Sequence, residues 1–75
     1  MDEVFRTIVI SFMDVDKYKR FLNYVKRGGI LSKYLKSYCN QTIWFTFDSV
    51  EFRNGMMDTL KSTVTSYNII KNNNQ

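Results

Sequence analysis

The stretch "QTIWFTFDSVEF", residues 41–52, contains the pattern of a strand followed directly by the pattern of a helix start. In its first half the side chains alternate between two sets, as they do in a strand, where successive side chains point to opposite faces. One set is Ile43, Phe45 and Phe47, and the other is Thr42, Trp44 and Thr46. We therefore predict a strand over residues 42–47 with the first set in the core. Trp44, the only tryptophan, is expected on the opposite face.

The second half of this stretch resembles the N-terminus of a helix. Asp48 is a suitable N-cap, and Glu51 three residues later completes a variant capping box. Phe47 and Phe52 flank this cap at the positions of a hydrophobic staple. The sequence therefore predicts that a helix begins after Asp48.

Apolar residues extend this helix, because Met56 and Leu60 follow Phe52 at helical spacing. Asn54-Gly55 is a dipeptide typical of hairpin turns, but the residues after it, "MMDTLK", do not alternate as a second strand would. A helix through this dipeptide is therefore the better interpretation. Gly55 then costs about 1 kcal/mol relative to alanine, and we expect it to permit a close approach of the first helix.

The N-terminal third predicts a strand and an amphipathic helix. "FRTIVISF", residues 5–12, is β-branched and aromatic on both faces, which favours a central strand. Asp14 then provides an N-cap, with Met13 expected to pack against Tyr18 as a staple. The apolar stripe of this helix is Tyr18, Phe21, Leu22 and Val25. The glycine pair at 28–29 is expected to end the helix.

Residues 30–38, "ILSKYLKSY", fit two patterns. Leu31, Tyr34, Leu35 and Tyr38 have helical spacing, whereas the lysines and the short turn "YCNQT" that follows favour an edge strand. We predict the edge strand. Residues 63–70, "TVTSYNII", are rich in β-branched residues and are predicted as the last strand.

The predicted element order is therefore β-α-β-β-α-β. Two split β-α-β units of this kind form a ferredoxin-like fold of the α+β class, with a four-stranded antiparallel sheet in the order 4-1-3-2 and two helices on one face. Residues 1–70 are expected to make this single domain. Residues 71–75, "KNNNQ", are expected to be a disordered polar tail.

The composition indicates a small folded domain. The chain has 75 residues, of which 44% are hydrophobic and 16% aromatic, too many for a disordered protein. A domain of this size buries only about 60% of the surface of its unfolded chain, so a partner or a second copy would add useful stability. The net charge of +4 is compatible with nucleic acid and also with simple solubility.

Few groups are available for catalysis or for metal binding. The chain has no histidine and one cysteine, Cys39, which excludes an intrachain disulfide and a zinc site. Asp14 and Asp48 are already explained as helix caps. We therefore predict no enzyme activity, no catalytic residue, no metal and no cofactor. No apolar run is long enough to cross a membrane and no leader is visible, so a cytoplasmic location is expected.

The face of the sheet that carries Trp44 is the predicted binding site. The expected members of this face are Trp44, Thr42 and Thr46, beside Thr7, Val9 and Ser11 of the first strand, with Tyr67 from the last strand. The edge strand adds Tyr34 and Tyr38, or Leu31 and Leu35 in the other register. Tryptophan and tyrosine are the side chains that most often anchor protein interfaces. We predict a protein-binding module, as a homodimer or on another protein. The absence of Pro and His, with abundant Asn, Lys and Ile, suggests a phage-encoded inhibitor or adaptor that acts in the host cytoplasm.

The alternative is a protein that binds RNA or single-stranded DNA. Trp44 would then stack on a base, as aromatics on open sheets do, although "QTIWFTF" lacks the basic-Gly-aromatic pattern of RNA-recognition motifs. The cations expected to contact phosphates are Lys33, Lys36, Lys17, Lys19, Arg20, Lys26 and Arg27.

Overall fold

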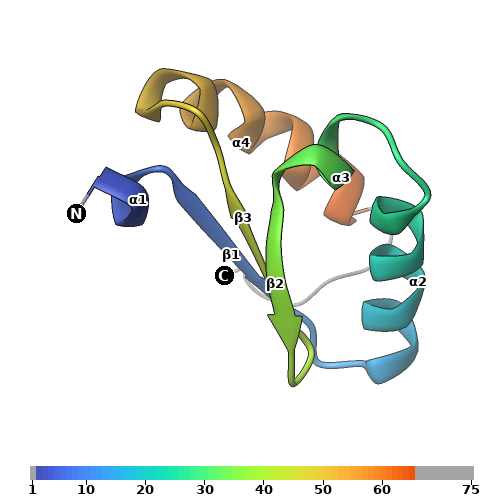
Figure 1. The fold of residues 1–75 in the computed structure, drawn as a ribbon. Helices are drawn as coiled ribbons and strands as arrows, with labels where there is room; N and C mark the ends of the chain where they lie inside the picture. The colour runs from blue at the N-terminus through green and yellow to red at the C-terminus, as the bar shows by residue number, and fades with distance from the viewer. Residues whose placement is uncertain (1, 66–75) are drawn as a thin grey trace.

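A computed structural model describes residues 2–65, which fold into a three-stranded sheet packed against helices (Figure 1). In chain order the elements are α1 (Asp2–Phe5), β1 (Thr7–Ser11), α2 (Val15–Lys26), α3 (Ile30–Tyr34), β2 (Leu35–Cys39), β3 (Thr42–Thr46) and α4 (Val50–Thr65). This arrangement is compatible with the predicted α+β class.

The sheet has the order β1-β3-β2, with β3 antiparallel to both neighbours. Trp44 in β3 lies opposite Val9 of β1 on one side and opposite Ser37 of β2 on the other. Within residues 2–65, β1 is therefore an edge strand and not the predicted central strand. The prediction of a four-stranded ferredoxin-like sheet is wrong.

The prediction of a fourth strand over residues 63–70 is wrong at its start, because residues 63–65 belong to α4. Val64 continues the spacing of Met56 and Leu60 and is buried with them. The Thr63 hydroxyl donates to the Thr59 carbonyl oxygen at 2.9 Å, one helical turn back. Burial of a continuous apolar stripe here outweighs the β preference of Thr and Val. The rest of the predicted strand, with Tyr67, and the predicted tail at 71–75 lie outside the described residues.

Residues 30–38 combine both of the patterns seen in their sequence. The first part forms α3 and the second part forms β2, which is an edge strand as predicted. Gly28 and Gly29 have φ angles of 118° and 94°, so the glycine pair ends α2 as predicted. The ring of Tyr34 in α3 lies 5.1 Å from the ring of Phe47, which holds this short helix on the core.

One of the two predicted N-caps is confirmed and the other is displaced by one residue. The Asp14 carboxylate accepts a hydrogen bond from the Asp16 amide at 2.8 Å at the start of α2. At α4 the cap is Ser49, whose hydroxyl accepts from the Phe52 amide at 3.0 Å. The Asp48 carboxylate instead accepts from the Tyr34 hydroxyl at 3.0 Å. The tyrosine in α3 thus takes the acceptor that the sequence assigned to capping.

The predicted packing around these helix starts is correct at α4 and wrong at α2. The rings of Phe47 and Phe52 meet edge to face at 5.8 Å, as expected. Met13 is 81% exposed, and Phe12 packs on Tyr18 in its place, with the ring centroids 6.2 Å apart. Gly55 lies in open space, since a Cβ built on it would meet nothing within 4 Å. The expected close approach of another helix to Gly55 is therefore wrong.

The core lies between one face of the sheet and the helices. Its buried side chains are Ile8, Phe12, Phe21, Leu22, Val25, Leu31, Ile43, Phe45, Phe47, Met56, Leu60 and Val64. Phe21 of α2 meets Phe45 of β3 edge to face at 6.5 Å. The predicted assignment of Ile43, Phe45 and Phe47 to the core is confirmed, and Trp44 lies on the opposite face.

The turn between β2 and β3 consists of two residues, Asn40 and Gln41, with φ angles of 49° and 62°. Two consecutive left-handed residues are typical of a type I′ hairpin. Gln41 also contacts the end of β1. Its carbonyl oxygen accepts from the Phe12 amide, and its side-chain amide donates to the Phe12 carbonyl oxygen, both at 2.8 Å. The hairpin tip and the end of β1 are thereby joined by a pair of hydrogen bonds.

Candidate functional site

The face of the sheet opposite the core is the candidate site, and we call it the open face. The strand register assigns to it Thr7, Val9 and Ser11 from β1, Thr42, Trp44 and Thr46 from β3, and Ser37 and Cys39 from β2. This set contains no Lys, Arg, Asp or Glu. The open face is therefore an uncharged surface on a chain whose net charge is +4.

Trp44 occupies the centre of the open face, between Val9 and Ser37 on the neighbouring strands. Its side chain is partly exposed, and Val9 beside it is 54% exposed. A tryptophan next to an exposed valine forms an apolar centre. Small hydroxyl side chains surround this centre on the same face.

Two hydroxyl pairs hold β1 against β3 on this face. The hydroxyl oxygens of Thr7 and Thr46 are 2.9 Å apart, and those of Ser11 and Thr42 are 3.2 Å apart. Each hydroxyl thus has a partner within the sheet. A docking molecule would gain chiefly from covering the apolar centre, because these polar groups are already hydrogen-bonded.

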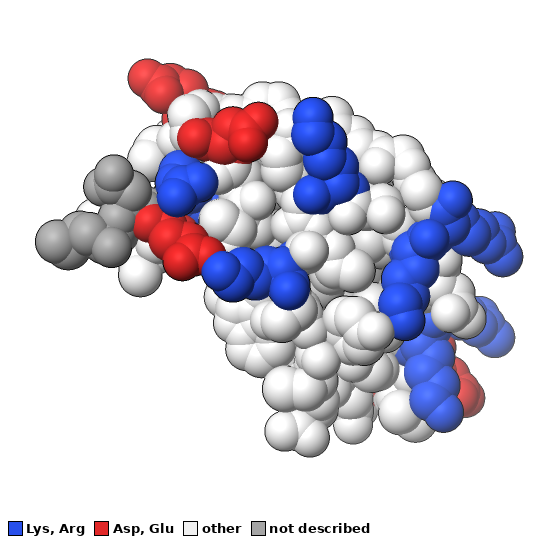
Figure 2. All heavy atoms as spheres, viewed as in Figure 1, with Lys and Arg blue, Asp and Glu red and all other residues white. Residues whose placement is uncertain are grey.

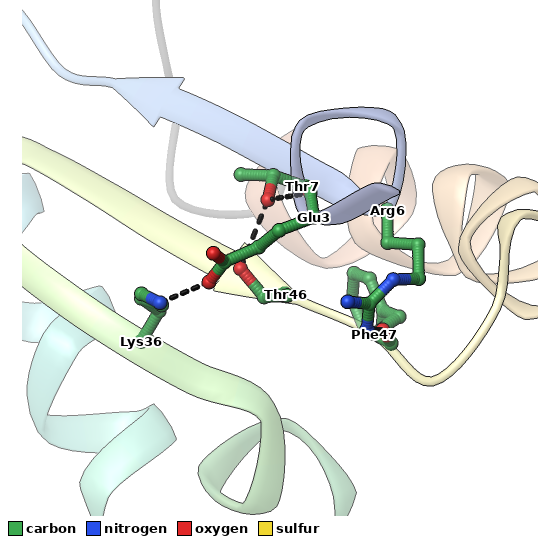
Figure 3. A network of polar contacts seen from close by, with 6 residues as sticks. All are labelled: Glu3, Arg6, Thr7, Lys36, Thr46 and Phe47. Carbon is green, nitrogen blue, oxygen red and sulfur yellow. Dashed lines mark hydrogen bonds and ion pairs between the residues drawn. The ribbon is translucent and has the colours of Figure 1, made fainter. Parts of the chain in front are cut away.

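One end of the open face is bounded by α1. The Lys36 ammonium donates to the Glu3 carboxylate, and the Thr7 hydroxyl donates to the Glu3 carbonyl oxygen at 2.6 Å. Figure 3 shows Glu3 and Lys36 reaching toward each other near Thr46. The hydrogen bond from Lys36, and then its charge, lower the pKa of the Glu3 carboxyl below its ordinary value. This ion pair gives the uncharged face a charged boundary.

The structure brings only part of the predicted partner-binding set together. Trp44, Thr42 and Thr46 share the open face as predicted. Tyr38 lies opposite Ile43 in the register and so belongs to the other face. Tyr34 is in α3, where its ring packs on Phe47 and Phe52. Their expected place beside Trp44 is wrong. The two-residue turn pairs Cys39 with Thr42 and therefore Tyr38 with Ile43, and residues 30–34 form α3 instead of a strand.

The predicted nucleic-acid residues are separated from Trp44. Lys17, Lys19, Arg20, Lys26 and Arg27 are on or at the end of α2, and α2 packs against the core face of the sheet through Phe21. Lys33 lies over the ring of Tyr34 at 5.5 Å, and Lys36 is paired with Glu3. A single strand that stacks on Trp44 would therefore not meet the cations of α2 on the same face.

Three members of the site were not predicted from the sequence. Ser37 and Cys39 were not assigned to the open face, and Glu3 was not connected with Lys36. A signal for the first two exists in "CNQT", since a two-residue turn at Asn40-Gln41 places Cys39 opposite Thr42. No local pattern indicates the ion pair, because its two residues are 33 positions apart.

A shallow hollow of about 580 Å³ lies beside α1 and is lined by Phe5, Arg6, Asp48, Ser49 and Val50. The Arg6 guanidinium donates to the Phe47 carbonyl oxygen at 2.7 Å, which fixes the start of β1 to the end of β3. Arg6 thus already has a structural role. In the part of the chain that the structure describes, no three His, Cys, Asp or Glu side chains gather where they could hold a metal ion.

Among residues 2–65, no helix has both the length and the apolar character needed to span a membrane. Comparisons of the chain with protein-family models, with curated proteins and with solved structures found no match.

Proposed function

We propose that this protein is a small non-enzymatic binding module whose open face docks onto a partner protein, in the manner of an inhibitor or adaptor that acts by occupying a surface. The observation that carries this proposal is the apolar centre formed by Trp44 and Val9. It lies on the face of the sheet opposite the core, where Val9 is 54% exposed and Trp44 is partly exposed. Exposed apolar surface of this kind is a common feature of interaction sites.

The chemistry of the open face supports a protein partner. Interface centres are depleted in charge and enriched in tryptophan, and their rims are polar. Trp44 provides such a centre, and the Glu3–Lys36 pair lies at its rim. Two copies of this chain can also meet through this face without repulsion between like charges, since the cations of α2 belong to the opposite side of the sheet.

The test compares Trp44→Ala with Tyr38→Ala. Tyr38 is a partly exposed aromatic residue on the other face of the same sheet, so it is a matched control. Self-association is measured by sedimentation equilibrium. Partners captured on the wild-type protein are titrated against each variant by calorimetry. If Trp44 is a hot spot, Trp44→Ala weakens association by about 2 kcal/mol or more while Tyr38→Ala has little effect.

A dissociation constant that is unchanged by Trp44→Ala, for the second copy and for every captured partner, contradicts the proposal. Circular dichroism of each variant shows whether the fold is retained. Capture of a protein from a lysate counts in favour of the proposal only where Trp44→Ala abolishes or weakens it.

A further inference from the structure

A second surface of the molecule concentrates positive charge. Residues 17–36 contain seven Lys and Arg and no Asp or Glu. Five of these cations are on or at the end of α2, and Figure 2 shows blue side chains gathering on the side of the molecule where α2 lies in Figure 1. The acidic residues lie in α1, at the start of α2, in the connection before α4 and along α4. The chain therefore has one strongly basic side.

The geometry of α2 arranges its outward cations in two pairs. Lys19 and Arg20 precede Lys26 and Arg27 by seven residues, which is two helical turns or about 10 Å at a rise of 1.5 Å per residue. All four are exposed, while Phe21, Leu22 and Val25 on the other side of the helix are buried in the core. The two pairs form a row of positive charge along the outside of the molecule.

An aromatic ring lies beside this row. The Lys26 ammonium is 4.6 Å from the centre of the Tyr38 ring, and Tyr38 is 40% exposed. Tyr38 is on β2, an edge strand, so its ring is at the border between sheet and helix. Cations next to an exposed aromatic ring are the combination with which proteins bind single strands, through phosphates and stacked bases.

We propose that this basic surface, made of Lys19, Arg20, Lys26, Arg27 and Tyr38, binds single-stranded nucleic acid. The cations of α2 contact phosphates, and the ring of Tyr38 stacks on an unpaired base. Trp44 takes no part, because it lies on the other face of the sheet. The site is thus independent of the open face, and a molecule with both surfaces can join a protein to a nucleic acid.

The apolar side of α2 argues against a membrane surface as the ligand. A helix that binds a membrane inserts its apolar face between lipids, whereas the apolar face of α2 is already buried against the sheet. The exposed ring of Tyr38 distinguishes a single strand from a duplex, because only unpaired bases offer a free surface for stacking.

The experiment measures the binding of a fluorescently labelled twelve-nucleotide single strand, as RNA and as DNA, by anisotropy at several salt concentrations. Each phosphate contact with a single strand contributes about −0.7 to the slope of log affinity against log salt, so four contacts predict a slope of about −2.8. Neutralising all four cations to Gln is expected to lower affinity at low salt by roughly tenfold or more and to flatten the slope.

Single substitutions make the test independent of any folding defect in the fourfold variant. Lys19→Gln on α2 and Lys61→Gln on α4 each remove one exposed helix lysine. Only Lys19→Gln is expected to reduce affinity. Tyr38→Ala is expected to reduce it severalfold at every salt concentration, because stacking persists when charges are screened. Trp44→Ala is expected to leave it unchanged.

Three outcomes overturn the proposal. Equal losses for Lys19→Gln and Lys61→Gln mean a general attraction between nucleic acid and a positively charged protein. Equal affinity for duplex and single strand, with no effect of Tyr38→Ala, means that stacking of a base on Tyr38 does not contribute to binding. Equal affinity for polyglutamate of the same charge assigns the surface to acidic proteins. None of these results bears on the open face, whose test depends on Trp44.

Discussion

The role of a side chain in this protein depends on the groups that surround it as much as on its residue type. Asp48 is a good N-cap by residue type, yet its carboxylate accepts from the Tyr34 hydroxyl and Ser49 caps the helix. The sequence correctly predicts that a capped helix begins here, since both candidates are adjacent. The choice between them depends on Tyr34, fourteen residues away, which no local pattern includes.

The Glu3–Lys36 ion pair predicts a dependence on pH. Because the pKa of Glu3 is lowered in the folded state, its contribution to stability is present above the ordinary carboxyl pKa. That contribution is lost as the pH falls through the lowered value. Both side chains are about half exposed, so the effect on total stability is expected to be small.

Lys36→Gln is expected to raise the pKa of Glu3 back toward its ordinary value. NMR titration of the Glu3 side chain measures this shift directly. Lys61→Gln, which removes an exposed lysine from α4, is the control because it leaves the Glu3–Lys36 pair intact. A midpoint for Glu3 that does not move in Lys36→Gln would contradict the assigned cause.

Gly55→Ala is expected to stabilise the protein by about 0.5–1 kcal/mol. Gly55 is an exposed residue inside α4, and an added Cβ meets nothing within 4 Å. Alanine at such a position restricts the unfolded chain and improves helix propensity. The matched control is Gly29→Ala, which is expected to destabilise, because Gly29 has a φ of 94°. Urea unfolding of both variants gives the two free energies, and destabilisation by Gly55→Ala would show that the glycine is required.

At the scale of helices and strands, the sequence predicts the elements that a local pattern specifies. It does not predict the conformations that depend on packing in the core. The amphipathic stripe of α2 is confirmed, because Phe21, Leu22 and Val25 are all buried as the spacing indicates. The end of α4 was mistaken for a strand because Thr63, Val64 and Thr65 prefer strands by type. Val64 continues the spacing of Met56 and Leu60, and its burial with them in the core decides the conformation of these residues.

The same limit applies to the candidate site. The alternation around Trp44 is local and correctly predicts a strand here and the two faces of its side chains. Tyr38 lies opposite Ile43 because the two-residue turn pairs Cys39 with Thr42. The bulge between Leu35 and Ser37, which no glycine or proline marks, shifts the register of the residues before it. A pattern of period two cannot be extended across such a point.

Ser49→Ala tests the cap of α4. The hydroxyl of Ser49 accepts the Phe52 amide, and removal of an N-cap hydroxyl costs about 0.5–2 kcal/mol. Thermal or urea unfolding is expected to show this loss, and Ser49→Asp is expected to restore most of it, because a carboxylate also accepts from the helix amides. Equal stability of wild type and Ser49→Ala would indicate that Asp48 can replace the cap.

At the scale of the whole molecule, stability depends on a small aromatic core. A chain of this length is expected to have a free energy of unfolding of about 4–11 kcal/mol. Phe45→Ala removes a fully buried ring that touches Phe21 and Phe47 and is expected to cost about 3–5 kcal/mol. Urea unfolding followed by circular dichroism is expected to show this loss as a lower free energy of unfolding.

Val9→Ala is the matched control, since Val9 lies on the open face and is largely exposed. Its loss is expected to change the free energy of unfolding by less than about 1 kcal/mol. A similar cost for the two substitutions would contradict the assignment of the two faces of the sheet.

The strand order has a consequence for how the chain assembles. The central strand β3 meets β2 through a turn of two residues, whereas its contacts with β1 join residues 31 to 39 positions apart. The hairpin is therefore expected to form early. The entropic cost of closing the long loop between β1 and β3 is incurred only when β1 pairs with the hairpin. The pair of hydrogen bonds between Gln41 and Phe12 then joins the hairpin tip to the last strand to pair. Gln41→Ala, which removes the side-chain bond of this pair, is therefore expected to speed unfolding more than it slows folding.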